Sequence, residues 1–298
     1  MRLTATAPGK LILLGEYAVL EGARSLVAAV DRYAQVTLTP STDTNHHLSS
    51  PTLGVVPIPF SVHAQDGVEY HAPISKQNRR QLRFVQNLLT HQFSAYSPAR
   101  TNNTPADIAI TTDGFYDETG SKLGLGSSAA MTVALCAGLQ GYFGDTPEMP
   151  AEKNALFDQS LEAHRSAQGK VGSGIDVAGS TFGNVLCYRA DTGENHRWEI
   201  TALKGWPEDL YPLTIWTGVS VSTTRFVKRL NQYKRQNLRA YEDTMGELIR
   251  LSEDGSDYFQ WTRWSEFLET VDKYYHQLQR LGSEAGISII SDVHRHIH

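Results

Sequence analysis

The stretch Lys122-Leu-Gly-Leu-Gly-Ser-Ser-Ala-Ala130 decides the fold. Gly124 and Gly126 permit positive φ and let a ligand approach the bare backbone, and two hydroxyls, those of Ser127 and Ser128, follow at once. From Ser128 onward the chain continues as an apolar run typical of a buried helix. A glycine loop that leads into a helix directs unpaired N–H groups and the positive end of the helix dipole at one point. The stretch therefore predicts a polyphosphate site, and with it nucleotide binding and phosphoryl transfer.

Glycine-rich turns also occur without a ligand, and this one matches neither the GxGxxG nor the GxxxxGK[ST] pattern. A second segment, Ala7–Gly22, strengthens the prediction because Lys10 interrupts a run that otherwise favours a strand. A lysine there either reaches into water from an edge strand or serves as a fixed cation for a transferred phosphoryl group. Glu16 and Tyr17 follow in a turn, where they either line a small acceptor pocket or lie on the surface.

A third glycine-rich segment, Gly169–Ser180, places Asp176 between apolar neighbours. An aspartate after such a turn commonly caps a helix. A buried carboxylate needs a partner, however, and an ion pair with Lys10 would keep Asp176 ionised and direct it at an acceptor oxygen.

Composition limits the classes of function. The chain has 298 residues, 40% of them hydrophobic and 20% charged, which fits one large globular domain or two that pack closely together. A formal net charge of −5 gives no reason to expect nucleic acid as a partner. Cys136 and Cys187 lack metal-ligand spacing and predict buried free thiols. No signal peptide and no apolar run of membrane-spanning length is visible, so we expect a cytoplasmic protein without a membrane partner.

Strand and helix patterns alternate without regular βαβ spacing, which favours an α+β fold over a doubly wound sheet. We expect Thr39–Ser61 to be loop with a short strand at its end, Leu213–Thr217 to be a short buried strand, and Asp257–Leu281 to be one helix. A soft domain boundary falls between Leu186 and Leu213.

In chain order, Pro8-Gly-Lys10, Gly124-Leu-Gly-Ser-Ser-Ala-Ala130 and Gly172-Ser-Gly-Ile-Asp176 resemble the signature motifs of the GHMP kinase superfamily, and the resemblance runs from residue 4 to about 290. It implies a ribosomal-S5-like N-terminal domain (1–200) packed on a ferredoxin-like C-terminal domain (201–298), with MgATP and the acceptor in the cleft between them. It implies that Lys10 and Asp176 are catalytic and that Ser127 or Ser128 ligates Mg²⁺. ATP would bind Lys122, Gly124, Leu125, Gly126, Ser127, Ser128 and Ala129.

Within the superfamily the chain is most similar to the phosphomevalonate kinases. The opening Ala7–Leu20, the segment Gln168–Asp176 and the segment Trp216–Val227 carry that similarity. It implies transfer of the γ-phosphoryl group of MgATP to phosphomevalonate, giving diphosphomevalonate. Mevalonate kinases carry a metal-ligating glutamate where this chain has His164, and a neutral imidazole is a poor Mg²⁺ ligand. We therefore expect a different metal shell or an anion-facing role for His164.

The chemistry of the acceptor points the same way. A phosphomonoester has a second pKa near ~6 and is mostly dianionic at neutral pH, so it needs cations more than a general base. We therefore interpret Asp176 mainly as an organiser of Lys10. The residues expected at the acceptor are Glu16, Tyr17, His164, Lys170, Gly172, Ser173, Ser222, Thr223 and Arg225, although plain helix capping also explains Ser222 and Thr223.

Three alternatives stay open: a mevalonate kinase or other small-molecule GHMP kinase, a diphosphomevalonate decarboxylase, and a non-catalytic ligand-binding protein of the same fold. The third glycine-rich motif of the superfamily is not found in Glu284–His298. We therefore expect either an incomplete copy of a longer protein or a natural lack of that closure. A monomer and a homodimer are both compatible with the sequence.

Overall fold

Two long strands form the spine of the molecule, for which a computed structural model describes residues 1–63, 67–76, 78–96, 101, 104–144, 153–169, 172–190, 198–204, 206, 210–218 and 223–297. Strand β1 (Leu3–Leu14) pairs antiparallel along strand β2 (Ser25–Pro40). On its other edge, β2 pairs with β7 (Val185–Ala190) through its first half and with β6 (Ala106–Thr111) through its second half. This branching lets one sheet serve two hydrophobic cores.

The sheet continues outward from both branches. Beyond β6 lie β3 (His46–Ser50), β4 (Val55–His63) and β5 (Gly67–Tyr70), and beyond β7 lies β8 (Trp198–Ala202). The β3–β6 pair is parallel and the other pairs are antiparallel, so the eight-stranded sheet is mixed. Short 3₁₀ turns follow β1, β3 and β6: η1 (Ala18–Glu21), η2 (Pro51–Leu53) and η3 (Asp113–Phe115).

A bulge interrupts the spine beside Lys10. Pro8 lies opposite Tyr33, whereas Gly9 lies opposite Val30, so two residues of β2 have no partner on β1. A bulge bends the strand and re-aims the side chains that follow it. The second half of β1, which begins at Gly9, therefore takes a different direction from the first half.

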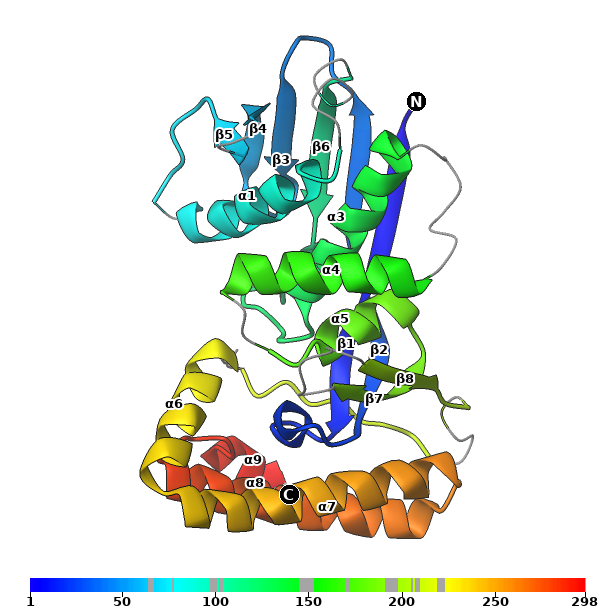
Figure 1. Ribbon diagram of the computed structural model, residues 1–298, viewed down its shortest axis with the longest axis vertical. Helices are drawn as coiled ribbons and strands as arrows, with labels where there is room; N and C mark the ends of the chain where they lie inside the picture. The colour runs from blue at the N-terminus through cyan, green and yellow to red at the C-terminus, as the bar shows by residue number, and fades with distance from the viewer. Residues whose placement is uncertain are drawn as a thin grey trace.

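Four helices cover one face of the sheet: α1 (Arg79–Phe93), α3 (Ser127–Phe143), α4 (Lys153–Gln168) and α5 (Ile175–Phe182) (Figure 1). Helix α3 is apolar on nearly all sides, as a helix must be when it is buried between a sheet and another helix layer. The two cysteines, Cys136 in α3 and Cys187 in β7, are buried free thiols as the sequence predicted.

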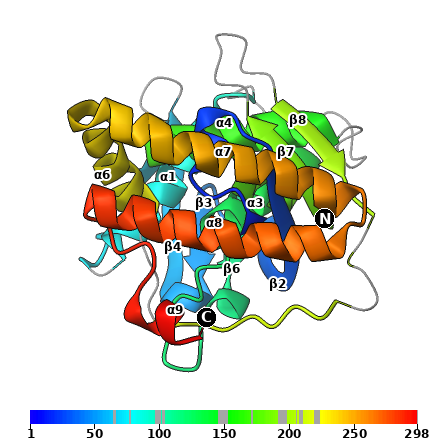
Figure 2. The ribbon, with the colours of Figure 1, turned by 90° about the horizontal axis from the view of Figure 1, so that it is seen from below.

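A helical layer closes one end of the sheet. Helices α7 (Leu238–Gln260) and α8 (Trp264–Ala285) lie side by side and antiparallel, with α6 (Thr223–Gln236) and α9 (Asp292–Ile297) beside them (Figure 2). Their apolar faces form a second core with the end of the spine, in which Leu14 and Leu26 pack with Leu248 and Leu281. Among the described helices, none is long and apolar enough to cross a membrane.

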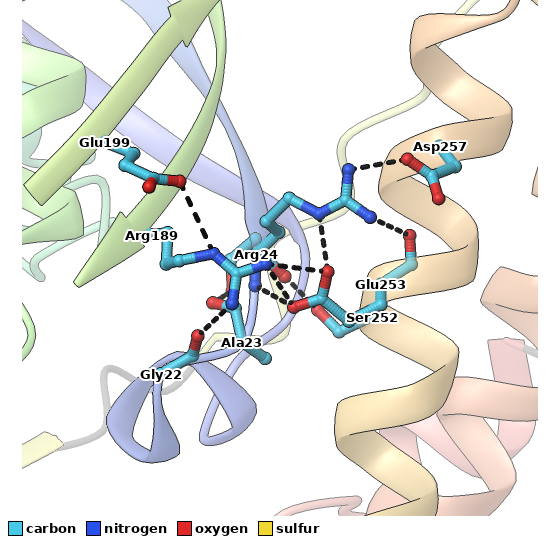
Figure 3. Close-up of polar contacts among 9 residues, drawn as sticks. Gly22, Ala23, Arg24, Arg189, Glu199, Ser252, Glu253 and Asp257 are labelled. Atoms are coloured by element: carbon cyan, nitrogen blue, oxygen red, sulfur yellow. Dashed lines mark hydrogen bonds and ion pairs between the residues drawn. The ribbon is translucent and has the colours of Figure 1, made fainter. Parts of the chain in front are cut away.

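A network of ion pairs also fastens the helical layer to the sheet (Figure 3). Arg24, just before β2, donates to Glu253 through its backbone N–H at 2.9 Å and to Asp257 through its guanidinium at 2.5 Å. Arg189 of β7 lies 2.9 Å from the same Glu253 carboxylate and donates to the Gly22 carbonyl at 2.9 Å. Glu253 therefore ties two strands to α7.

The α+β class expected from the sequence is confirmed, but three local predictions are wrong. Thr39–Ser61 has the strand expected at its end, as part of β4, but it also contains β3 where loop was expected, because its polar residues alternate with buried Leu48, Ile58 and Phe60. Leu213–Thr217 forms no strand and is exposed, with Leu213 84% accessible. Asp257–Leu281 is broken at Thr262, whose φ of 58° ends α7 and separates it from α8.

Candidate active site

The glycine loop is attached to the spine strand directly at Lys10. The backbone N–H of Lys10 donates to the carbonyl of Leu125 at 2.9 Å. A Cβ on Gly9 would lie 2.6 Å from that carbonyl and 2.5 Å from the ring of Phe115, so only glycine allows this approach. The first two sequence motifs therefore meet through the backbone.

Helix α3 begins at this junction with its N–H groups available. Gly126 is its N-cap residue, with φ 78° and ψ 31°, and no side chain caps the helix. The first backbone bond of the helix runs from the Ala130 N–H to the Gly126 carbonyl at 3.1 Å. The N–H groups of Ser127, Ser128 and Ala129 therefore need partners from outside the helix, as in an anion site.

The side chain of Lys10 passes between two glycines from different motifs. A Cβ on Gly126 would lie 3.0 Å from Lys10 Cγ, and a Cβ on Gly179 would lie 3.0 Å from Lys10 Cβ. Gly179 belongs to α5, the helix that follows the third motif. The glycine loop and α5 therefore both pack against the side chain of Lys10.

Asp176 lies in the first turn of α5, and Gly174 is the N-cap of that helix. Because Asp176 and Gly179 are three residues apart, they share the helix face that meets Lys10. The Asp176 carboxylate accepts from the Val177 N–H at 3.0 Å. The expected ion pair with Lys10 is not among the contacts of the described residues. The lysine stem instead packs against Gly179, three residues further along the same helix.

Glu16 and Tyr17 leave the end of β1 in an unusual turn. Tyr17 has φ 65° and ψ −43°, a strained conformation for a residue with a side chain. Burial raises the pKa of Glu16, and the charge of Lys10 opposes that rise. Burial also raises the pKa of the Tyr17 hydroxyl. The structure thus places a buried carboxyl within the electrostatic reach of Lys10.

His164 reaches the N-terminus of α3 from α4. Its ring is buried, and its Nε2 lies 3.4 Å from Ser128 Oγ and 3.1 Å from the amide nitrogen of Gln168. The ring of Phe84 meets it edge-on, with centroids 5.9 Å apart. His164 therefore lies beside Ser128 at the start of α3, and its role at the acceptor stays a prediction.

Lys122, Gly172 and Ser173 are also among the residues expected at the site. Lys122 is exposed, and its ammonium lies 5.7 Å from the ring centroid of Tyr116. Gly172 and Ser173 precede α5, and the Ser173 carbonyl accepts from the Tyr188 hydroxyl at 2.7 Å. The predictions for Lys170 and Ser222, and for the side chains of Thr223 and Arg225, lie outside the described residues.

Sequence reasoning missed a cavity of about 450 Å³ beside the glycine loop. Tyr116, which carries Lys122 over its ring, is one of its walls. The others come from η2, the start of α1 and the turn before the loop, which are separated in sequence and carry no motif. Its lining residues are Thr52, Leu53, Asn78, Asp113, Tyr116, Asp117 and Gly120. Within the described ranges, no three His, Cys, Asp or Glu side chains gather as a metal site.

Part of the chain matches a known protein family, and two kinases are similar to the chain in sequence. Residues 89–184 match the family of GHMP kinases N terminal domains. The phosphomevalonate kinase of Streptomyces sp. (strain CL190) is 27% identical over 96% of this chain and 80% of its own length. The mevalonate kinase of Aeropyrum pernix is 31% identical over 64% of this chain and 51% of its own length.

A solved structure shows the same fold. Streptococcus pneumoniae phosphomevalonate kinase, in complex with phosphomevalonate and AMPPNP, superposes with a TM-score of 0.62 at 19% identity, covering 94% of this chain and 81% of that one. Residues 89–184 therefore match a GHMP kinase N-terminal domain, and the chain has the fold of the GHMP kinases. Among GHMP kinases, it is similar to phosphomevalonate kinases and mevalonate kinases.

Proposed function

We propose that the chain transfers the γ-phosphoryl group of MgATP to phosphomevalonate. The observation that carries the proposal is the position of Lys10, which lies between the uncapped N-terminus of α3 and the helix that bears Asp176. A cation fixed between a phosphate site and an acceptor site neutralises charge that develops on a transferred phosphoryl group. The similarity to a phosphomevalonate kinase over most of both chains supports this acceptor.

The nucleotide would lie along the glycine loop. The free N–H groups of Ser127, Ser128 and Ala129, together with Lys122, would hold the phosphates, while Gly124, Leu125 and Gly126 leave the backbone open to them. The neighbouring cavity of about 450 Å³ is of a size to receive the nucleoside. Its polar walls offer the amide of Asn78 and the carboxylate of Asp113 to a base or a ribose.

The residues at the phosphate site fit Mg²⁺ held chiefly by the nucleotide. Ser127 and Ser128 supply hydroxyl oxygens, and no carboxylate cluster stands beside them in the described part of the chain. Mg²⁺ usually keeps several waters and binds through substrate phosphates with few protein ligands. When bound, the metal would neutralise the β- and γ-phosphate oxygens. His164, beside Ser128 Oγ, would orient that hydroxyl.

The acceptor would approach from the side of α5 and the turn after β1. Its phosphate oxygen forms the new bond to the γ-phosphorus as the bond to the β-γ bridging oxygen of ATP breaks, which releases ADP. A dianionic acceptor has no proton that must be removed first, so the proposed role of Asp176 is to balance the charge of Lys10 from the helix that packs against the lysine stem, not to remove a proton. Glu16, Tyr17, Gly172 and Ser173 would line this side, and Lys170, Ser222, Thr223 and Arg225 are proposed to complete it.

A coupled assay that monitors ADP release, with phosphomevalonate and mevalonate offered in parallel, tests the proposal. We expect a clear preference in kcat/KM for phosphomevalonate. A preference for mevalonate would instead establish the second candidate, which the 31% identity to a mevalonate kinase favours. ATP binding without turnover of either acceptor would indicate the non-catalytic alternative and refute the proposal.

A further inference from the structure

The turn that carries Glu16 and Tyr17 is held by the C-terminal helical layer, on which it lies. The hydroxyl of Tyr274, in α8, donates to the carbonyl of Glu16 at 2.7 Å. Tyr274 is only 3% accessible, so this bond is shielded from water. We propose that Tyr274 is a positioning residue for the acceptor, which it influences through the backbone of Glu16. This inference rests on the proposed function for its kinetic consequences.

The turn needs such a hold because its backbone is unfavourable by itself. Gly15 has φ 100°, and Tyr17 has φ 65° with no side-chain cap on the short helix η1 that it begins. Non-glycine residues at positive φ persist only where the surroundings fix them. Within the turn, the Val19 N–H bonds to Gly15 and the Leu20 N–H to Tyr17, each at 3.0 Å. Neither of these two bonds engages the Glu16 carbonyl.

The other end of the turn has a separate attachment. The carboxylate of Glu21 accepts from Lys234 at 2.8 Å and from the Tyr241 hydroxyl at 2.7 Å. Figure 1 shows this turn directly over α7 and α8, so both attachments come from the helical layer. Tyr274 holds the Glu16–Tyr17 end of the turn, where the charge of Lys10 acts on the Glu16 carboxyl. Glu21 anchors the other end of the turn, which is nearer to β2.

Loss of the Tyr274 hydroxyl would leave the Glu16 carbonyl without this partner and let Tyr17 relax from its strained conformation. Glu16 and Tyr17 would then shift relative to Lys10, whose own position is set independently by Gly126 and Gly179. Binding of the acceptor should suffer. The nucleotide contacts at the N-terminus of α3 should not, because none of them involves this turn.

Tyr274→Phe tests the inference, because it removes the hydroxyl and keeps the ring. Tyr233→Phe is the matched control: Tyr233 is a buried residue of the helical layer, and its hydroxyl donates to Glu284 at 3.0 Å and does not touch the turn. A typical hydrogen bond corresponds to a factor of about 2 to 12, so we expect Tyr274→Phe to raise KM for phosphomevalonate by about that factor. KM for ATP should stay within about twofold, and Tyr233→Phe should leave both KM values unchanged.

Hydrogen–deuterium exchange gives a second readout that does not depend on turnover. In Tyr274→Phe the amides of Val19 and Leu20 should exchange faster than in the unaltered protein, and in Tyr233→Phe they should not. If exchange in Gly15–Gly22 is unchanged, or if the two KM values rise equally, the inference is wrong. If exchange responds as expected while the unaltered protein phosphorylates neither acceptor, the proposed function fails and the positioning of the turn by Tyr274 stands.

Discussion

Lys10 packs directly against Gly179, where a methyl group would lie 3.0 Å from Lys10 Cβ. Strand β1 and helix α5 can approach this closely because the helix presents no side chain at that point. The bulge at Gly9 directs the second half of β1 toward the helix, and the glycine loop confines the lysine from the other side. The position of the ammonium group therefore depends on small residues in three separate segments.

Substitution of Gly179 should displace Lys10. In Gly179→Ala the new methyl group would also lie 3.1 Å from Val27 Cγ2, so the lysine must give way. Misplacement of a catalytic group by about 1 Å can cost up to about a hundredfold in rate. With Lys10 in its proposed role, we expect kcat/KM in the coupled assay to fall by at least about tenfold. Gly246→Ala is the control, because that helical glycine of α7 has open space around it. It should gain about 0.5–1 kcal/mol in stability and keep full activity.

The role of Asp176 can be separated from that of a general base. If Asp176 supports Lys10 and does not remove a proton, Asp176→Ala should lower kcat by about tenfold to a hundredfold. Loss of a general base typically lowers the rate by about 10²- to 10⁴-fold. Asp176→Asn should recover part of that loss, because the amide oxygen can still accept the Val177 N–H. A loss of several orders of magnitude in both variants would show that Asp176 removes a proton.

The stability of the protein should depend on pH through His46, which lies far from the site in β3. Its ring is 3% accessible and stacks on Phe60 with centroids 5.1 Å apart, and burial lowers its pKa from 6.5 to about 4. The folded state therefore favours the neutral ring, and the unfolded state binds the proton first as the pH falls below 6.5. The contribution of His46 to the free energy of unfolding is therefore fully present above pH 6.5 and is lost progressively as the pH falls toward 4.

Urea unfolding at pH 7 and pH 5 measures the effect. We expect His46 to lower the free energy of unfolding by about 2 kcal/mol at pH 5 relative to pH 7. His46→Asn is the reference variant, because its amide oxygen can accept the Ala106 N–H that His46 Nδ1 accepts at 3.1 Å. The free energy of unfolding of the variant should differ correspondingly less between pH 7 and pH 5. A difference equal to that of the unaltered protein would rule His46 out as the source.

Glu253 should matter more for stability than a neighbouring glutamate on the same helix. Glu253→Ala removes the carboxylate that Arg24 and Arg189 share, and hydrogen bonds to charged groups contribute about 1.5–3 kcal/mol. Because these side chains are about a quarter to a third accessible, we expect the free energy of unfolding to fall by about 1–2 kcal/mol. Glu247→Ala breaks only an exposed ion pair with Arg250 and should change the free energy of unfolding by less than about 0.5 kcal/mol. Equal losses in the two variants would refute a special role for the network.

Local sequence patterns predicted the motifs that meet at Lys10, because a glycine loop, a lysine in a strand and an aspartate after a glycine turn each have a recognisable signature. They also predicted α3, whose apolar composition leaves no alternative to burial. Strand β3 escaped prediction because its inward positions include His46 and Ser50, polar residues that the core accommodates through ring stacking and backbone bonds.

Other features depend on contacts that no local pattern encodes. Tyr274 reaches Glu16 across 258 residues, and the cavity beside Tyr116 draws its walls from separate turns. The expected ion pair of Lys10 with Asp176 was inferred from residue types alone, and the packing at Gly179 decides where the lysine stem lies. Leu213–Thr217 has the β-branched composition of a strand but no neighbour with which to pair among the described residues.

The bond between Tyr274 and Glu16 has a consequence for the order in which the protein is made on the ribosome. The glycine loop and α3 are synthesised early enough to assemble against β1 while the remainder of the chain is still being translated. The turn after β1 cannot take its final shape until α8 emerges, 258 residues later than Glu16. With the proposed function, a nascent chain should therefore acquire affinity for nucleotide before it can discriminate among acceptors.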